Sequence, residues 1–379
     1  MYNINDVKIK LIPISVQRLV DIEDDDYFKG DKFKNFVSNS SMSLINPSQG
    51  GSPSKFITGF DKKKPAGALE LGTAVHRMLL EKGKFFIDDI VKPTGKIAAV
   101  MEYYFALLHV PELTAEEAIK IACEQADYYK DRLTQTRIDN VLRDGKVYLD
   151  HLFDRNNCQD CITLTQEHKD KLDRCLTSVK ANEKLTHLLE GQLSNNFIRH
   201  NEDVFIMKAE ATLPPKSVDE FEDKTTNVWL KVKIDNWSID FENKVVTLND
   251  LKTTGTSIAD FAGGETENMN LDGEVYKTKT YGSFEKFHYY RQMAFYLKIL
   301  KTYAEVEYDA TEVNGWTFKC NMLVVETNEP HYSHVFEVGD KWLALGEYEY
   351  TSLLKRIAYH EEYGYDSFVN LDMNNITLL

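Results

Sequence analysis

The stretch "VVTLNDLKTT", residues 245–254, begins as an apolar, β-branched run and changes character at Asp250. The run predicts a half-buried strand that ends near this aspartate. Residues i and i+2 of a strand point to the same face, so Asp250 and Lys252 project side by side. They form either a surface ion pair of little energetic value or one half of a metal-dependent phosphodiesterase site. The rest of the chain has to decide between these interpretations.

A second carboxylate, Asp235, ends another predicted strand, "VWLKVKID", residues 228–235. One face of this strand is apolar, and the other carries Trp229, Lys231, Lys233 and Asp235. Asp235 is either a polar turn residue or a partner of Asp250, because the ends of neighbouring strands can converge. Paired carboxylates suit Mg²⁺ or Mn²⁺. Lys252 beside such an ion would orient the attacking water or neutralise developing phosphate charge.

A histidine lies on a helix predicted over residues 69–82, "LELGTAVHRMLLEK". Seen alone, His76 is more often a core histidine than a metal ligand. The small residues Gly72 and Ala74 on the same turn permit close approach of another element. His76 therefore remains open as a ligand until its neighbours are known.

Three more polar residues have two interpretations each. Gln292 and Tyr296 are spaced i, i+4 and share one face of a helix predicted over residues 284–302. That helix is either an ordinary aromatic-rich core helix or a support for the site. Glu210, one strand before Asp235, is either a further ligand or an exposed strand residue.

The order of predicted elements indicates one α/β core. Strands fill residues 203–252, the helix at 284–302 follows, and two further strands precede a last helix at 340–361. We expect an N-terminal extension and connector at 1–66, then one domain at 67–379. A mainly helical insertion is expected at about 100–200.

Charge and cysteine content limit the class of protein. The 379 residues carry 45 Lys+Arg and 60 Asp+Glu, a net charge of −15. This argues against a protein that coats nucleic acid with a basic face, although a local basic groove remains compatible. The N-terminus shows no apolar signal or anchor, so we expect a soluble, cytoplasmic protein with no membrane partner. Reduced thiols are favoured over a zinc site, for which the candidate ligands are Cys123, Cys158, Cys161 and Cys175.

Taken in order, these motifs resemble those of a known superfamily. His76 in "GTAVH", Asp235 in "KID", Asp250 and Lys252 in "DLK", and Gln292 and Tyr296 in "QMAFY" follow one another along the chain. The order resembles the PD-(D/E)XK nuclease superfamily in its RecB-like branch. Together with "SSMSLINPS" and "LELGTAVHRMLLE", it is similar to the exonuclease VIII (RecE-type) exodeoxyribonucleases of phages and prophages.

The resemblance implies a restriction-endonuclease-like core, a mixed central sheet flanked by helices, and a role for each matching residue. The implied metal ligands are His76, Asp235, Asp250 and the Leu251 carbonyl, with Glu210 at a less regular acidic position. Lys252 would be the catalytic lysine. Gln292 and Tyr296 would position DNA or support the site, and Lys231 and Lys233 are the candidates for a basic groove, with residues 62–64 a weaker one.

The expected activity is Mg²⁺- or Mn²⁺-dependent hydrolysis of DNA from linear duplex ends, in phage-type recombination. The family also implies a single-strand-annealing partner and a homo-oligomer. Two alternatives are a RecB-like nuclease of CRISPR adaptation or defence and a non-catalytic DNA-binding protein on the same fold. An iron–sulfur cluster is not expected, because only Cys320 follows the helix of Gln292. The chain departs from the family pattern in its acidity, in Lys233 where Gly or Arg is common, and in a longer segment between Lys252 and Gln292.

Overall fold

The computed structural model describes most of the chain. The described residues are 6–59, 68–81, 85–88, 90–129, 132–158, 162–191, 194–215, 222–269 and 274–365. The weaker basic candidate at 62–64 and Cys161 lie outside them. Each of the four described cysteines is free of a disulfide bond.

The chain divides into two compact units, the first formed by residues 1–81 and 174–379 and the second by residues 82–173. This differs from the expected division in two ways. The described N-terminal residues belong to the first unit, because β1 (Lys8–Leu19) pairs with β4 (Phe197–Leu213) in the main sheet. The second unit also begins and ends earlier in the chain than the helical insertion expected at about 100–200.

The first unit contains one large sheet, a small hairpin and most of the helices. Its strands are β1, β4, β5 (Lys224–Asp240), β6 (Val245–Thr254), β7 (Gly263–Met269), β8 (Val275–Tyr281), β9 (Thr317–Glu326) and β10 (Ser333–Glu337). Its helices are α1 (Asp24–Lys29), η2 (Asp31–Phe33), α2 (Asn39–Ile45), η3 (Pro47–Gln49), α3 (Pro53–Thr58), α4 (Ala68–Leu80), α9 (Glu183–Glu190), α10 (Ile258–Ala262), α11 (Ser283–Lys286), α12 (Tyr289–Tyr308), η5 (Glu312–Asn314) and α13 (Asp340–Tyr363).

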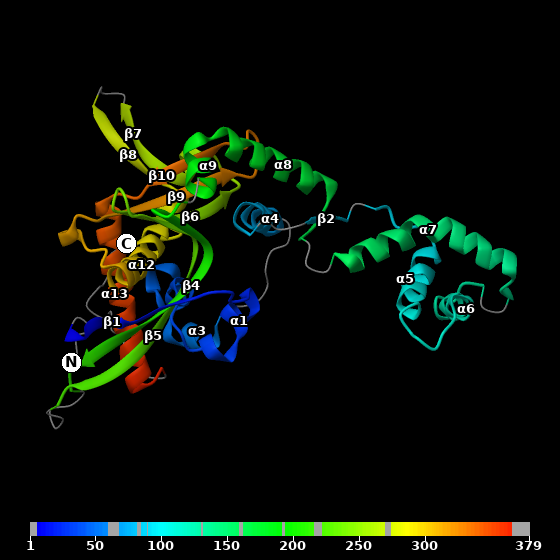
Figure 1. Cartoon of the computed structure of the whole chain (residues 1–379), viewed down its shortest axis with the longest axis horizontal. Coiled ribbons are helices and arrows are strands. Elements are labelled where there is room, and N and C mark those ends of the chain that lie inside the picture. Colours follow the sequence, from blue (N-terminus) through cyan, green and yellow to red (C-terminus); the bar gives the residue numbers. More distant parts are fainter. Residues whose placement is uncertain are drawn as a thin grey trace. The chain divides into compact units, whose positions relative to one another are not determined.

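The main sheet has six strands in the order β1-β4-β5-β6-β9-β10 (Figure 1). β6 and β9 are parallel, and all the other neighbours are antiparallel, so the sheet is mixed as expected. A parallel pair needs a crossover connection, and α12 lies within the one between β6 and β9. The chain is therefore a mixed α/β protein in which α12 is the longest element of the crossover between β6 and β9.

The core of the first unit lies between this sheet and the helices α12 and α13. Alternate residues of β5 such as Leu230 and Val232 are fully buried, as the alternating sequence pattern predicts. Met293 and Phe295 on α12 and Leu354 on α13 belong to the same apolar cluster. Burial of this face fixes the helix that carries Gln292 and Tyr296 against the sheet.

Two strands are longer than predicted, and this changes the place of the aspartates. The strand expected to end at Asp235 continues to Asp240 as β5, so Asp235 lies inside a strand. β6 likewise continues past Asp250 to Thr254, alongside β9. The two aspartates are therefore not at strand ends, and their meeting has another cause, described below.

The polar segment between Lys252 and Gln292 is more ordered than its turn-rich composition predicts. It contains α10, the antiparallel hairpin of β7 and β8, and α11. Hairpin pairs such as Glu265 opposite Lys279 and Glu267 opposite Lys277 place opposite charges side by side, a pairing that favours a two-stranded ribbon.

The second unit has its own apolar core. It contains β2 (Phe85–Ile87), α5 (Ile97–Leu107), α6 (Ala115–Gln125), α7 (Gln135–Asn157) and β3 (Ile162–Leu164), and α8 (Gln166–Ala181) continues from it into the first unit. Val100, Ala122 and Val141, one from each long helix, are fully buried in this core. Among the described helices of the whole chain, none has the length and apolar content needed to cross a membrane.

Candidate metal-binding site

The candidate site forms where β5 separates from β6. Pairing between these strands ends at Asn236 and Asn249, whereas β6 continues beside β9 to Thr254. The N–H of Leu251, no longer opposite a β5 carbonyl, donates instead to Oδ2 of Asp235 at 2.8 Å. The Leu251 carbonyl points to the same edge of the strand as its N–H. This divergence opens the edge of β6 toward the Asp235 carboxylate.

Asp250 and Lys252 contact each other through a carboxylate that is buried in the protein. The Lys252 ammonium lies 2.5 Å from Oδ2 of Asp250, and the Asp250 side chain is 1% exposed. On the other carboxylate oxygen, Gln292 of α12 donates from Nε2 at 2.7 Å. A surface ion pair is thus excluded, because the carboxylate is held from two elements within the protein.

The helix α4 brings His76 to these strands from far along the sequence. A Cβ on Gly72 would lie 2.7 Å from Oγ1 of Thr253, so this glycine permits the close approach of α4 to β6. Nε2 of His76 lies 3.4 Å from Oδ2 of Asp235 and 3.6 Å from Oε1 of Glu202. The structure therefore places His76 beside one predicted ligand and one that the sequence analysis did not identify.

Glu202 on β4 is the acidic residue that sequence reasoning missed. The neighbouring pairs are Asn201 with Asn236 and Asp203 with Ile234, so Glu202 lies opposite Asp235. Its φ of 60° is unusual for a residue other than glycine. The register of the β4–β5 hairpin determines which residue faces Asp235, and no local sequence pattern displays that register.

The prediction that Glu210 is a further ligand is not supported by the geometry. Glu210 pairs with Asn227 rather than with Asp235. At 3.3 Å per residue, its eight-residue distance from Glu202 corresponds to about 26 Å along the strand. Glu202, not Glu210, is the β4 carboxylate that faces Asp235.

These two glutamates provide a matched test on one strand. We expect Glu202→Gln to weaken Mg²⁺ binding by at least about tenfold, because a carboxylate facing the ion is lost. Glu210→Gln, the same change farther along β4, should leave the affinity unchanged. Calorimetric titration with Mg²⁺ measures both, and a larger loss in Glu210→Gln would refute this assignment.

The two lysines predicted to bind DNA are both engaged within the protein. Lys231 is buried, donates to the Tyr27 carbonyl at 2.7 Å, and lies 4.6 Å from the centre of the Tyr27 ring. Its predicted role in a basic groove is therefore wrong. Lys233 lies 2.6 Å from a carboxylate oxygen of Asp24 and 2.6 Å from one of Glu202. Lys233 thus orders the acidic cluster instead of standing free for a phosphate.

His76 and Asp235 each stabilise the charged form of the other. Burial lowers the pKa of His76, but the hydrogen bond and charge of Asp235 together with Glu202 outweigh it and raise the pKa to about 9. Burial opposes ionisation of Asp235, yet His76, Lys252 and the Leu251 N–H together lower its pKa. A metal ion needs a neutral imidazole, so binding at His76 must release this proton.

The pKa values of the other two carboxylates, Asp250 and Glu202, are raised rather than lowered. Burial is the main cause that raises the pKa of Asp250 to about 6, with the Asp235 charge adding to it and Lys252 opposing it. Burial and Asp235 likewise raise the pKa of Glu202 to about 7. Burial lowers the pKa of Lys252, but Asp250 and Asp235 outweigh it and raise the pKa. The charge of Asp235 thus disfavours ionisation of both Asp250 and Glu202, and a bound cation would relieve this repulsion.

The donor set fits a divalent cation. Ligand atoms of His76, Glu81 and Glu202 all lie within 4.8 Å of one another. Oε1 of Glu202 is buried and has no hydrogen-bond partner among the described residues. A pocket of about 610 Å³ adjoins the cluster and is lined by Glu81, Glu202 and Lys233 among others. Carboxylate oxygens are the ligands that Mg²⁺ and Mn²⁺ prefer.

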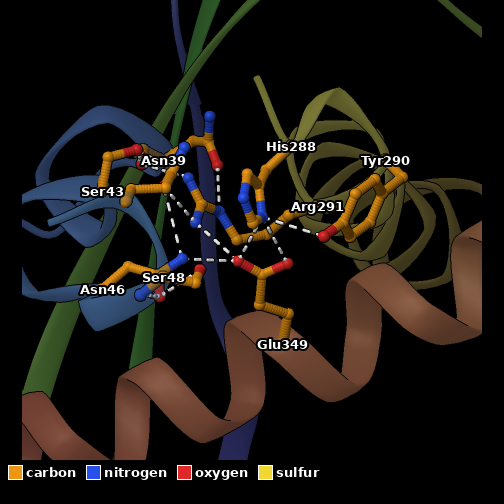
Figure 2. Close-up of polar contacts among 9 residues, drawn as sticks. Asn39, Ser43, Asn46, Ser48, His288, Tyr290, Arg291 and Glu349 are labelled. Carbon is orange, nitrogen blue, oxygen red and sulfur yellow. Dashed lines mark hydrogen bonds and ion pairs between the residues drawn. The ribbon is translucent and has the colours of Figure 1, made fainter. Parts of the chain in front are cut away.

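A buried polar network holds the start of α12 (Figure 2). The Arg291 side chain is fully buried and contacts Oε1 of Glu349 on α13 at 2.9 Å. Its other N–H groups donate to Oδ1 of Asn39 and Oγ of Ser43 on α2. His288, which precedes the helix without capping it, also contacts Glu349. The network therefore joins three segments around the first turn of α12, where Gln292 projects toward Asp250.

Tyr296 lies near the same carboxylates. Burial, together with the charges of nearby Tyr27, Asp250 and Asp235, raises its pKa well above the ordinary value, and a hydrogen bond with Gln292 opposes the rise. Tyr296 therefore stays protonated and supports Gln292 through its hydroxyl group. The structure thus brings together His76, Asp235, Asp250, Leu251, Lys252, Gln292 and Tyr296, and it adds Glu202.

Comparisons with known proteins assign no family to the chain. No family model and no curated protein matches the chain. Among solved structures, a "Putative exonuclease" from Eubacterium rectale is similar, with 11% sequence identity, a TM-score of 0.42 and coverage of 94% of each chain. At that TM-score the likeness assigns neither a fold family nor an activity, and the site is interpreted from its own geometry.

Proposed function

We propose that this protein is a metal-dependent nuclease that hydrolyses phosphodiester bonds of DNA on a PD-(D/E)XK-type core. One observation carries the proposal: an ammonium group, Lys252, lies 2.5 Å from the buried carboxylate of Asp250, where Asp235 and His76 also converge. Stability alone gives no reason to bury this pair, because apolar residues of similar size would serve as well or better. A hydrolytic site, in contrast, needs a cation, a general base or water-orienting group, and a positive charge for the phosphate.

The residues present divide these tasks. His76, Glu202 and Glu81, whose ligand atoms lie within 4.8 Å of one another, would hold a divalent cation. Asp235 and Asp250 would complete its ligands, with the Leu251 carbonyl at the adjoining strand edge. When bound, this cation supplies positive charge to the scissile phosphate and lowers the pKa of a water molecule.

The side chains around the carboxylates orient the reactants. Lys252 carries a charge that Asp250 and Asp235 stabilise, so it remains positive beside a phosphate oxygen and offsets the negative charge that develops there. Gln292 restrains the Asp250 carboxylate by its hydrogen bond at 2.7 Å. Tyr296 restrains Gln292 in turn. The Lys252 ammonium also lies 5.3 Å from the centre of the Tyr289 ring, which limits its movement.

The finer proposal is an exonuclease of the exonuclease VIII type, acting at linear duplex ends in phage-type recombination. It is supported by the order of the sequence motifs and by the meeting of their residues at one site. A single-strand-annealing partner and a homo-oligomer belong to the same proposal. The net charge of −15 means that phosphate contacts must come from local groups rather than from the overall field.

A digest of end-labelled DNA tests this function. With Mg²⁺ or Mn²⁺, we expect label to be released progressively from one end of a linear duplex, while a covalently closed circle of the same sequence stays intact. Excess EDTA should stop the reaction, and added Mg²⁺ should restore it. Equal cutting of the circle would show an endonuclease instead. No cutting of any DNA by metal-loaded protein would refute the proposed function.

A further inference from the structure

Four asparagines form one row of hydrogen bonds across the main sheet. Asn201 on β4, Asn236 on β5, Asn249 on β6 and Asn321 on β9 are direct cross-strand partners of their neighbours. Asn321 donates from Nδ2 to Oδ1 of Asn249 at 2.9 Å, and Asn249 donates to Asn236 at 2.6 Å. Asn236 donates to Asn201 at 2.7 Å. The four amides therefore point in one direction along the row.

The row ends on the helix that carries His76. Nδ2 of Asn201 donates at 2.8 Å to the carbonyl of Leu80, the last residue of α4. Carbonyls in the last turn of a helix have no partner within the helix. This bond ties the end of α4 to β4, one turn beyond His76. A continuous chain of amides thus joins β9 to α4 across the three strands between them.

Net stability does not explain the row. Asn236 and Asn249 are 0% exposed and Asn321 is 5% exposed, and burying amides costs free energy that their mutual bonds only offset. Apolar side chains of similar size at all three positions would be about as stable or more so. What the amides add is register, because a slip of one residue would break every bond in the row at once.

The row lies at the level of the candidate metal ligands. Each of three asparagines adjoins one carboxylate in sequence: Asn201 with Glu202, Asn236 with Asp235, and Asn249 with Asp250. Consecutive residues of a strand point to opposite faces. Where the strands are regular, the row therefore occupies the face opposite the carboxylates, directly behind them.

We propose that the asparagine row is the positioning element of the candidate site. It sets the register of β4, β5 and β6 and anchors α4, so that three carboxylates and His76 meet around one cation. The proposal rests on the metal-dependent function proposed above, but it concerns residues that touch neither metal nor DNA.

A double-mutant cycle on Mg²⁺ affinity tests the tie to α4. Asn201→Ala should weaken Mg²⁺ binding about tenfold, the lower range for loss of a group that orients a ligand. In a His76→Ala background the same change should have little further effect, because it acts through the helix of His76. The matched control is Asn182→Ala, which also removes an amide bond to a backbone carbonyl, that of Ser333, and should leave the affinity unchanged.

A second variant separates positioning from stability. Asn236→Leu/Asn249→Leu/Asn321→Leu should unfold in urea at or above the wild-type midpoint and yet bind Mg²⁺ at least about tenfold more weakly. Wild-type affinity in this variant would overturn the proposal. The proposal would also be overturned if the losses of Mg²⁺ affinity caused by Asn201→Ala and His76→Ala multiplied in the double variant. If the triple variant does not fold, this cycle alone decides the test.

The wild-type protein separates the two proposals. Mg²⁺ binding without cleavage of any DNA would refute the nuclease function, and the asparagine row would still be judged by the affinities. A wild-type protein that binds neither Mg²⁺ nor Mn²⁺ would overturn the positioning role as well, because no metal site would then exist for the row to set.

Discussion

Lys252→Ala should lower the rate of DNA cleavage by a hundredfold or more while metal and DNA binding persist. The reason is that removing one preorganised stabiliser of developing charge typically costs about 10²–10³ in rate. Lys252→Arg should not rescue, because a forked guanidinium does not reproduce a compact ammonium 2.5 Å from Asp250. Single-turnover cleavage of a linear duplex gives the rate, and calorimetry gives the Mg²⁺ affinity.

The same variant should also be less stable, by about 3 kcal/mol, since it leaves the buried Asp250 without its cationic partner. Asp250 already has its pKa raised to about 6 by burial, so it can take up a proton and limit this loss. Lys244→Ala is the matched control. Lys244 lies just before β6 and donates to the Asn314 carbonyl, and its loss should leave the rate unchanged. A fully active Lys252→Ala would show that the pair serves the fold alone.

The stretch 245–254 shows how far sequence reasoning reached. Its period of two placed Asp250 and Lys252 on one face, and their mutual contact follows from that spacing. The i, i+4 spacing similarly placed Gln292 and Tyr296 together on α12. Within a single element, side-chain geometry is fixed by the period of the element, which a sequence displays directly.

Relations between elements were less accessible. Glu210 is an acidic residue on the strand before that of Asp235, but the hairpin register places Glu202, not Glu210, opposite Asp235. The polar face of its strand predicts that Lys231 is exposed and can contact DNA. Tyr27, from a distant part of the chain, covers it. In both cases the two-residue period of the strand was predicted correctly. The residues that pack against the resulting strand face were not.

The asparagine row was invisible for the same reason. Asn201, Asn236, Asn249 and Asn321 are scattered polar residues in the sequence, and asparagine is depleted in strands in general. Only the register of four strands brings them into line. A buried polar network that spans strands is specified by tertiary structure, so no local pattern predicts it.

Asp250→Asn should abolish tight Mg²⁺ binding and, with it, cleavage. The change is nearly isosteric, and the asparagine oxygen still accepts the hydrogen bond that Gln292 donates to Oδ1. What is lost is the negative charge, while the nearby Lys252 keeps its positive charge and now repels a cation. We expect the affinity to fall by more than the roughly 10–100-fold that loss of a ligand's supporting partner costs.

Asp240→Asn is the control for this change, since Asp240 lies at the far end of β5 and accepts hydrogen bonds from the turn at Asn243. It should retain wild-type Mg²⁺ affinity and cleavage. Because this change also leaves the Lys252 ammonium without its carboxylate partner, circular dichroism and urea unfolding must show that Asp250→Asn is folded. If the folded variant bound Mg²⁺ as tightly as wild type, Asp250 would not be a ligand. The cation would then have to be held by His76, Glu202 and Asp235, and Asp250 would serve only to place Lys252.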